Sequence, residues 1–71
     1  MNALNARLLA AHAAHDHLAL VRLYREAADA VDGEARGFYL TQAYVFALET
    51  AHPEAATLQA ALVEMGRDVP G

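Results

Sequence analysis

Apolar residues recur every three or four positions along most of the chain, which is the spacing of one face of an α-helix. The first such stretch covers residues 3–14 and the second covers residues 17–31. Between them, HDH contains neither glycine nor proline, so one long helix over residues 3–31 is an alternative. We favour a break, because Asp16 is a residue type that caps helix starts. The apolar positions are Leu4, Leu8 and Ala11, then Leu20, Leu23, Tyr24, Ala27, Ala28 and Val31.

The second stretch should end at Asp32-Gly33, because glycine readily takes the left-handed conformation that follows a helix. On its polar side, arginines and acids stand four residues apart, which predicts ion pairs along the helix surface. The expected pairs are Arg22 with Glu26 and Arg25 with Asp29.

Residues 34–51 form the most apolar segment, since no charged residue occurs between Phe38 and Leu48. At helical spacing they give two apolar faces. A helix that is apolar nearly all round normally packs between neighbours. In a chain of 71 residues we expect one of these faces to lack an internal partner. One face contains Leu40, Ala43, Tyr44, Ala47 and Ala51; the other contains Phe38, Thr41, Val45 and Leu48.

A last helix should follow Pro53, which suits the first helical position, and should end at Gly66. Leu58, Leu62 and Met65 define its apolar stripe.

Together these elements predict an all-α fold in a single domain spanning residues 1–71. Four short antiparallel helices would form two stacked hairpins over residues 3–31 and 34–66, followed by a frayed tail at 67–71. The alternative is a three-helix bundle with one long N-terminal helix. Alanine, the best helix former, supplies much of the 56% hydrophobic content, and isoleucine is absent, so strands are not expected.

Composition narrows the possible partners. The net charge is −4, lysine is absent and the arginines form no basic stripe, so nucleic acid is not an expected partner.

No apolar run has the length of a membrane span, and no signal peptide is recognisable, so we expect a cytoplasmic location. With no cysteine, disulfides cannot support the small core. The lysine-free, alanine-rich composition is typical of proteins from GC-rich bacterial genomes.

The two expected turns, at His15 and Ala51, are 36 residues apart. Leu20, Tyr24 and Ala27 follow the first turn at helical spacing. In this repeat length, and in these residues of the second helix, the chain resembles the tetratricopeptide (TPR) family of helical hairpin repeats. The resemblance implies a TPR-like pair of hairpins whose first helices line a binding groove. That groove would contain Asn5, Leu9 and His12, and Phe38, Thr41, Val45 and Leu48.

The polar residues raise two questions, metal binding and catalysis. If one helix continued through HDH, His12, His15 and Asp16 would share a face and could bind a metal, although a solvated turn is the simpler interpretation. Catalysis has little basis, because serine and cysteine are absent and no glycine-rich phosphate loop occurs. We therefore expect no enzyme, no cofactor and no resident metal.

The sequence thus predicts a small non-catalytic protein–protein interaction module that uses an apolar helical face. Its partner would be a protein or peptide, such as an amphipathic helix or an extended apolar segment. Self-association as a homodimer is expected, because it would cover the surplus apolar surface. Two alternatives are a metal-binding helical protein that uses the histidine cluster and a structural subunit of a larger complex.

Overall fold

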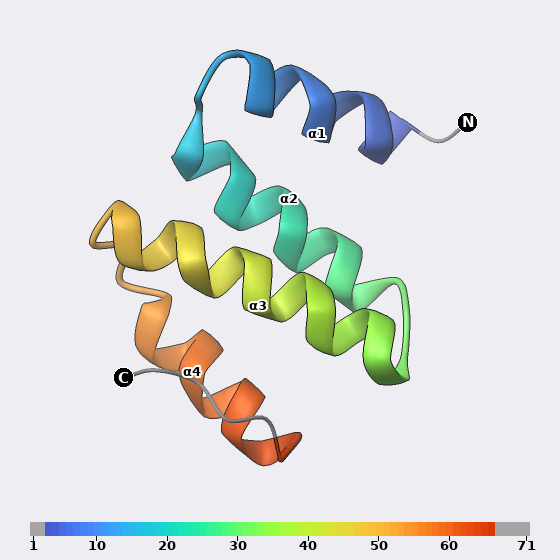
Figure 1. Cartoon of the computed structure of the whole chain (residues 1–71), viewed down its shortest axis with the longest axis vertical. Helices are drawn as coiled ribbons and strands as arrows, with labels where there is room; N and C mark the ends of the chain where they lie inside the picture. The colour runs from blue at the N-terminus through green and yellow to red at the C-terminus, as the bar shows by residue number, and fades with distance from the viewer. Residues whose placement is uncertain (1–2, 67–71) are drawn as a thin grey trace.

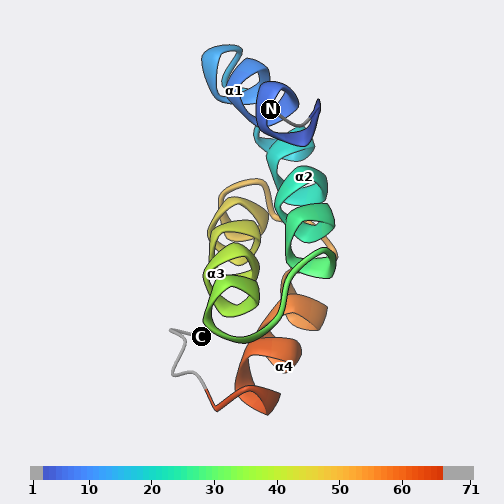
Figure 2. The same cartoon turned by 90° about the vertical axis from the view of Figure 1, so that its right-hand side faces the viewer.

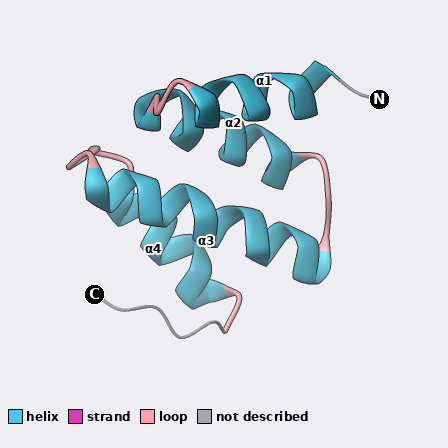
Figure 3. Cartoon of the chain, turned by 45° about the horizontal axis from the view of Figure 1, so that its top comes forward, coloured by secondary structure: helices cyan, strands magenta, loops and turns pink. Residues whose placement is uncertain are grey.

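Four helices follow one another in a zigzag in the computed structural model, which describes residues 3–66 (Figure 1). They are α1 (Ala3–Ala13), α2 (His17–Asp29), α3 (Gly33–Glu49) and α4 (Ala55–Glu64). Figure 3 shows helices joined by short loops, with no strand in the described part. The expected all-α fold of four helices is confirmed. The expected frayed tail, residues 67–71, lies outside the described residues.

The turns that follow α1 and α3 have the same geometry. His15 and Ala51, 36 residues apart, both have left-handed φ angles, 54° and 52°. After each of them, the next residue's N–H bonds five residues back: Asp16 to the Ala11 carbonyl (2.9 Å) and His52 to the Ala47 carbonyl (2.8 Å). These are the bonds of the Schellman motif, which satisfies carbonyls at a helix end. The long N-terminal helix considered as an alternative is therefore wrong, because the chain reverses at His15.

The start of α2 is capped as expected. The carboxylate of Asp16 accepts a hydrogen bond from the Ala19 N–H at 3.2 Å, which satisfies one of the donors left unpaired at a helix start.

The α2–α3 connection differs from the expectation. α2 ends at Asp29 rather than at residue 31, and Gly33, with a φ of 64°, opens α3 instead of closing α2. At the end of α2, the N–H of the cap residue Ala30 bonds to the Ala27 carbonyl at 3.1 Å and the N–H of Val31 bonds to the Ala28 carbonyl at 3.4 Å. The Arg36 guanidinium also donates to the Ala28 carbonyl at 3.3 Å and pairs with Asp29 at 3.7 Å. The helix thus ends without a left-handed glycine cap.

α4 is shorter at both ends than expected. It begins at Ala55, so Pro53 lies in the turn before it rather than at its first position. It ends at Glu64, which leaves Met65 as the cap residue, 38% exposed rather than buried. Gly66 takes the expected left-handed conformation, with a φ of 78°.

Each helix packs on the next in sequence: α1 on α2, α2 on α3 and α3 on α4. In Figure 2, α3 lies on one side of the molecule with α2 and α4 on the other, and α1 lies above α2, away from α4. The molecule is a slab of 30 × 26 × 14 Å. Because α2 is covered by both α1 and α3, its buried stripe is wide and includes Val21, which the expected stripe omitted.

Two apolar clusters form the core, and α2 contributes to both. The larger joins α2, α3 and α4; the smaller joins α1 and α2. The larger cluster contains Val21, Ala28, Leu40, Ala43, Tyr44, Ala47, Leu58 and Leu62, and the smaller contains Ala11, Leu20 and Leu23.

Ion pairs connect different helices rather than successive turns of α2, so the expected i,i+4 pairs are wrong. Glu26 pairs with Arg7 of α1 at 3.1 Å, and Arg25 pairs with Glu54 before α4. Asp29 pairs with Arg36, as described above. The acids of α2 are thus drawn toward cations on the neighbouring helices.

Candidate interaction surface

α3 has one apolar face that no other described helix covers. We call it the outer face of α3; it consists of Phe38, Thr41, Val45 and Leu48. Phe38 is 54% exposed, Val45 40% and Leu48 51%, whereas Thr41 is half-buried and its hydroxyl donates to the Gly37 carbonyl at 2.8 Å. The expectation that this face lacks an internal partner is confirmed. The other apolar face packs inside the molecule at Leu40, Ala43, Tyr44 and Ala47. Its last member, Ala51, is exposed in the turn after α3.

α1 also exposes its predicted site residues. Asn5, Leu9 and His12 are all exposed, Leu9 by 63%. With the 36-residue offset of the two turns, Leu9 occupies on α1 the position that Val45 occupies on α3. α1 and α3 are in contact through the rings of His12 and Phe46, whose centroids are 5.8 Å apart.

Rings from three helices form a cluster between α1 and α3. Tyr24 of α2 stacks on Phe46 with centroids 6.0 Å apart and an interplanar angle of 7°. Its hydroxyl hydrogen-bonds with the His12 Nε2 at 2.8 Å. His17 packs on the same Phe46 ring at 5.1 Å, and its Nδ1 lies 3.2 Å from the Glu49 carboxylate. These contacts fix α1 and the start of α2 against the C-terminal half of α3.

Partial burial, with Tyr39 close by, raises the pKa of the Tyr24 phenol. Desolvation is the larger cause, since it disfavours the charged phenolate. Tyr24 therefore remains neutral at physiological pH and serves as a hydrogen-bonding partner of His12.

The sequence analysis did not predict the ring cluster. Tyr24 was assigned to a buried stripe and Phe46 to no face. A signal existed in the spacing, because Tyr39 and Phe46 are seven residues apart and so share a side of α3 between the buried and exposed faces. Nothing in the sequence, however, indicated that the His12 ring lies against that side.

Within residues 3–66, the other exposed large apolar residues stand at helix ends and do not follow one another along one helix. Leu18 stands at the start of α2, whereas Val63 and Met65 stand at the end of α4. Single exposed apolar side chains of this kind are normal on protein surfaces. The outer face of α3 differs because its members follow each other at helical spacing on one helix.

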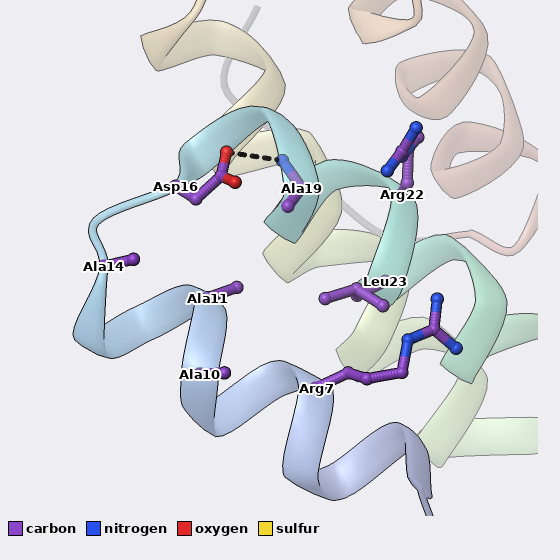
Figure 4. Close-up of a pocket in the computed structure, with 8 residues that line it drawn as sticks. All are labelled: Arg7, Ala10, Ala11, Ala14, Asp16, Ala19, Arg22 and Leu23. Carbon is purple, nitrogen blue, oxygen red and sulfur yellow. Dashed lines mark hydrogen bonds between the residues drawn. The ribbon is translucent and has the colours of Figure 1, made fainter.

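A pocket of about 310 Å³ lies between α1 and α2 (Figure 4). Half of its lining residues are alanines, and two of its three charged groups are already engaged: Arg7 by Glu26, and Asp16 by the Ala19 N–H. It presents no nucleophile–base pair. The lining residues are Arg7, Ala10, Ala11, Ala14, Asp16, Ala19, Arg22 and Leu23.

The residues considered for a metal site do not share a face. The turn at His15 removes the helical spacing that would have aligned His12 with Asp16. His12 is bonded to Tyr24, and Asp16 caps α2. In residues 3–66, no three or more histidine, cysteine or acidic side chains are grouped so as to hold a metal ion.

Comparison with known proteins gives no relative: no protein-family model, no curated protein and no solved structure matches this chain. None of the helices in the described range is long and apolar enough to cross a bilayer.

Proposed function

We propose that this protein is a non-catalytic protein–protein interaction module that binds through the outer face of α3 together with Leu9 of α1. The main support is that Phe38, Val45 and Leu48 are about half exposed, whereas the opposite face of α3 is buried from Leu40 to Ala47. Contiguous exposed apolar surface on a small protein usually marks a contact site.

The chemistry of this surface indicates the class of partner. No charged residue occurs from Phe38 to Leu48, so the surface offers neither ion pairs nor metal ligands. An apolar helical face suits a partner that presents an apolar helical face of its own, because both then exclude water along their length. The proposal includes three expectations from the sequence: that the chain is TPR-like, that it is cytoplasmic and that it self-associates.

Methyl and aromatic NMR signals recorded over a dilution series test the proposal. The signals of Leu9, Phe38, Val45 and Leu48 should shift or broaden as concentration rises. Those of Leu18 and Val63, which are 58% and 59% exposed, should stay constant and serve as internal controls. If no signal changes, or if the changes centre on Leu18 and Val63, the assigned surface is wrong.

A further inference from the structure

We propose that Asp32 and Gly33, where the link from α2 enters α3 (Figure 1), form a site of spontaneous covalent modification. At this site the aspartate is converted to isoaspartate in the folded protein. The site is separate from the outer face of α3, so this inference stands or falls independently of the proposed function.

The reaction is an intramolecular cyclisation followed by hydrolysis. The backbone nitrogen of Gly33 attacks the side-chain carboxyl carbon of Asp32 and forms a C–N bond. The nitrogen loses its proton and the carboxyl group loses its hydroxyl, so one water leaves and a succinimide ring remains. Water then opens the ring. Opening at the side-chain carbonyl restores aspartate, whereas opening at the main-chain carbonyl gives isoaspartate, in which the backbone runs through the former side chain.

The first argument is access to the attacking nitrogen. A side chain on the residue after aspartate would crowd this nitrogen, and glycine has none. Apart from the adjoining residues and the backbone of α3 itself, no heavy atom lies within 4 Å of the position that a Cβ of Gly33 would take. The N–H of Gly33 also stands at the start of α3, where a helix provides no carbonyl to accept it.

The second argument is the state of the carboxyl group under attack. Residues 3–66 contain three aspartates, and two of them are engaged: Asp16 accepts from the Ala19 N–H, and Asp29 pairs with Arg36. The side chain of Asp32 makes no capping hydrogen bond and no ion pair within that range. Among these three aspartates, Asp32 alone has a carboxyl group free to turn toward the next backbone nitrogen.

The third argument is exposure. Asp32 and the first three residues of α3, 33–35, are all exposed, so water reaches the ring directly. The backbone of Asp32 is extended, with φ −121° and ψ 171°, and ring closure requires a rotation about its Cα–C bond. The carbonyl of an N-cap residue accepts the first hydrogen bond of its helix. Isoaspartate at this position therefore alters the start of α3.

Peptide mapping of aged protein tests the inference. The chain is incubated at neutral pH and physiological temperature and digested with trypsin, and a fresh sample gives the background. One product is peptide 26–36, EAADAVDGEAR, which contains both Asp29 and Asp32. Chromatography separates the isoaspartyl form, and electron-transfer fragmentation assigns its position. We expect about ten times more isoaspartate at Asp32 than at Asp29 or Asp16, a factor equivalent to roughly 1.4 kcal/mol in activation free energy.

Asp32→Glu is the matched control. It keeps the charge and the following glycine, but attack by the backbone nitrogen then has to close a six-membered ring, which is slower, so no modified product should accumulate. Asp32→Asn is the positive control, because its amide releases ammonia in the same ring closure more readily than a carboxyl group releases water. Both variants should keep the native far-UV circular dichroism spectrum, since the Asp32 side chain makes no capping hydrogen bond.

The isolated peptide 26–36, incubated in the same way, serves as the unfolded reference. Isoaspartate formation at a similar rate in the folded chain and in the peptide supports the inference. If the peptide reacts while Asp32 of the folded chain reacts more than about ten times more slowly, the fold protects the site and the inference is overturned. Equal accumulation at Asp29 and Asp32, or none in either sample, overturns it as well.

Discussion

The two apolar faces of α3 have similar residues and opposite surroundings. Leu40, Ala43, Tyr44 and Ala47 are at most 3% exposed, whereas Phe38, Val45 and Leu48 are exposed by 40–54%. The difference arises because, within residues 3–66, only α2 and α4 pack on α3, and both lie on the same side of it (Figure 2). Helical periodicity marks a face as apolar, but the number and placement of neighbouring helices decide whether it becomes core or contact surface.

The largest expected effect is the difference between the same leucine-to-alanine substitution on the two faces of α3. Leu40→Ala should lower the free energy of unfolding by about 2–5 kcal/mol, because it leaves a cavity in the larger cluster. Leu48→Ala on the opposite face should lower the free energy of unfolding of the dilute monomer by less than about 1 kcal/mol, since the side chain is already 51% exposed. Urea unfolding of both variants measures the difference, and equal losses would remove the distinction between the faces.

The next effect concerns α2, which covers the inner face of α3, the face formed by Leu40, Ala43, Tyr44 and Ala47. Asp16→Ala should destabilise the protein by about 1 kcal/mol, because its carboxylate caps α2. Asp32→Ala is the matched control: Asp32 precedes α3 in the same way, but its side chain makes no capping hydrogen bond. Thermal unfolding should show a clearly smaller loss for the control. A loss as large as that of Asp16→Ala would mean that the Asp16 hydrogen bond contributes little.

A smaller effect concerns the turn that returns α4 to the inner face of α3. Ala51 has a left-handed φ, which costs a non-glycine residue about 1 kcal/mol, so Ala51→Gly should stabilise the protein by up to that amount. His15→Gly should gain less, because histidine tolerates this conformation better than alanine does. Differential scanning calorimetry can rank the two, and a lower melting temperature for Ala51→Gly would contradict the assigned geometry.

The smallest effect concerns Tyr24, at the boundary between the two faces. The raised pKa of Tyr24 means that the folded protein holds the phenol proton more tightly than the unfolded chain does. This contribution is fully present below the ordinary tyrosine pKa of about 10 and is lost as the pH rises above it. Tyr24→Phe should therefore reduce the loss of stability above about pH 10, measured as the pH dependence of urea unfolding. An unchanged profile would show that Tyr24 is not the group responsible.

Periodicity was sufficient to predict the helices and the split of α3 into two faces. Local residue types were sufficient for the Asp16 cap. The end of α2 was misplaced because the helix closes at Ala30, whose N–H bonds to the Ala27 and Ala28 carbonyls, and uses no glycine cap. The ion pairs were misassigned because Arg7 and Glu54, which are distant in sequence, compete with the local partners.

The candidate surface was predictable from α3 alone, because eleven residues without charge cannot all face inward in so small a chain. Its ring cluster was not predictable. It depends on how His12, Tyr24 and Phe46 from three helices meet, and this follows from the interhelical geometry.

The central claim is that α3 uses one face for folding and the other for binding. Sedimentation equilibrium over a wide concentration range tests it most directly, with Val45→Glu compared with the control Val63→Glu. We expect the native chain and Val63→Glu to rise from 7.6 kDa toward twice that mass, and Val45→Glu to remain at the monomer mass. A native chain that stays at 7.6 kDa throughout, or two variants that behave alike, would contradict the account.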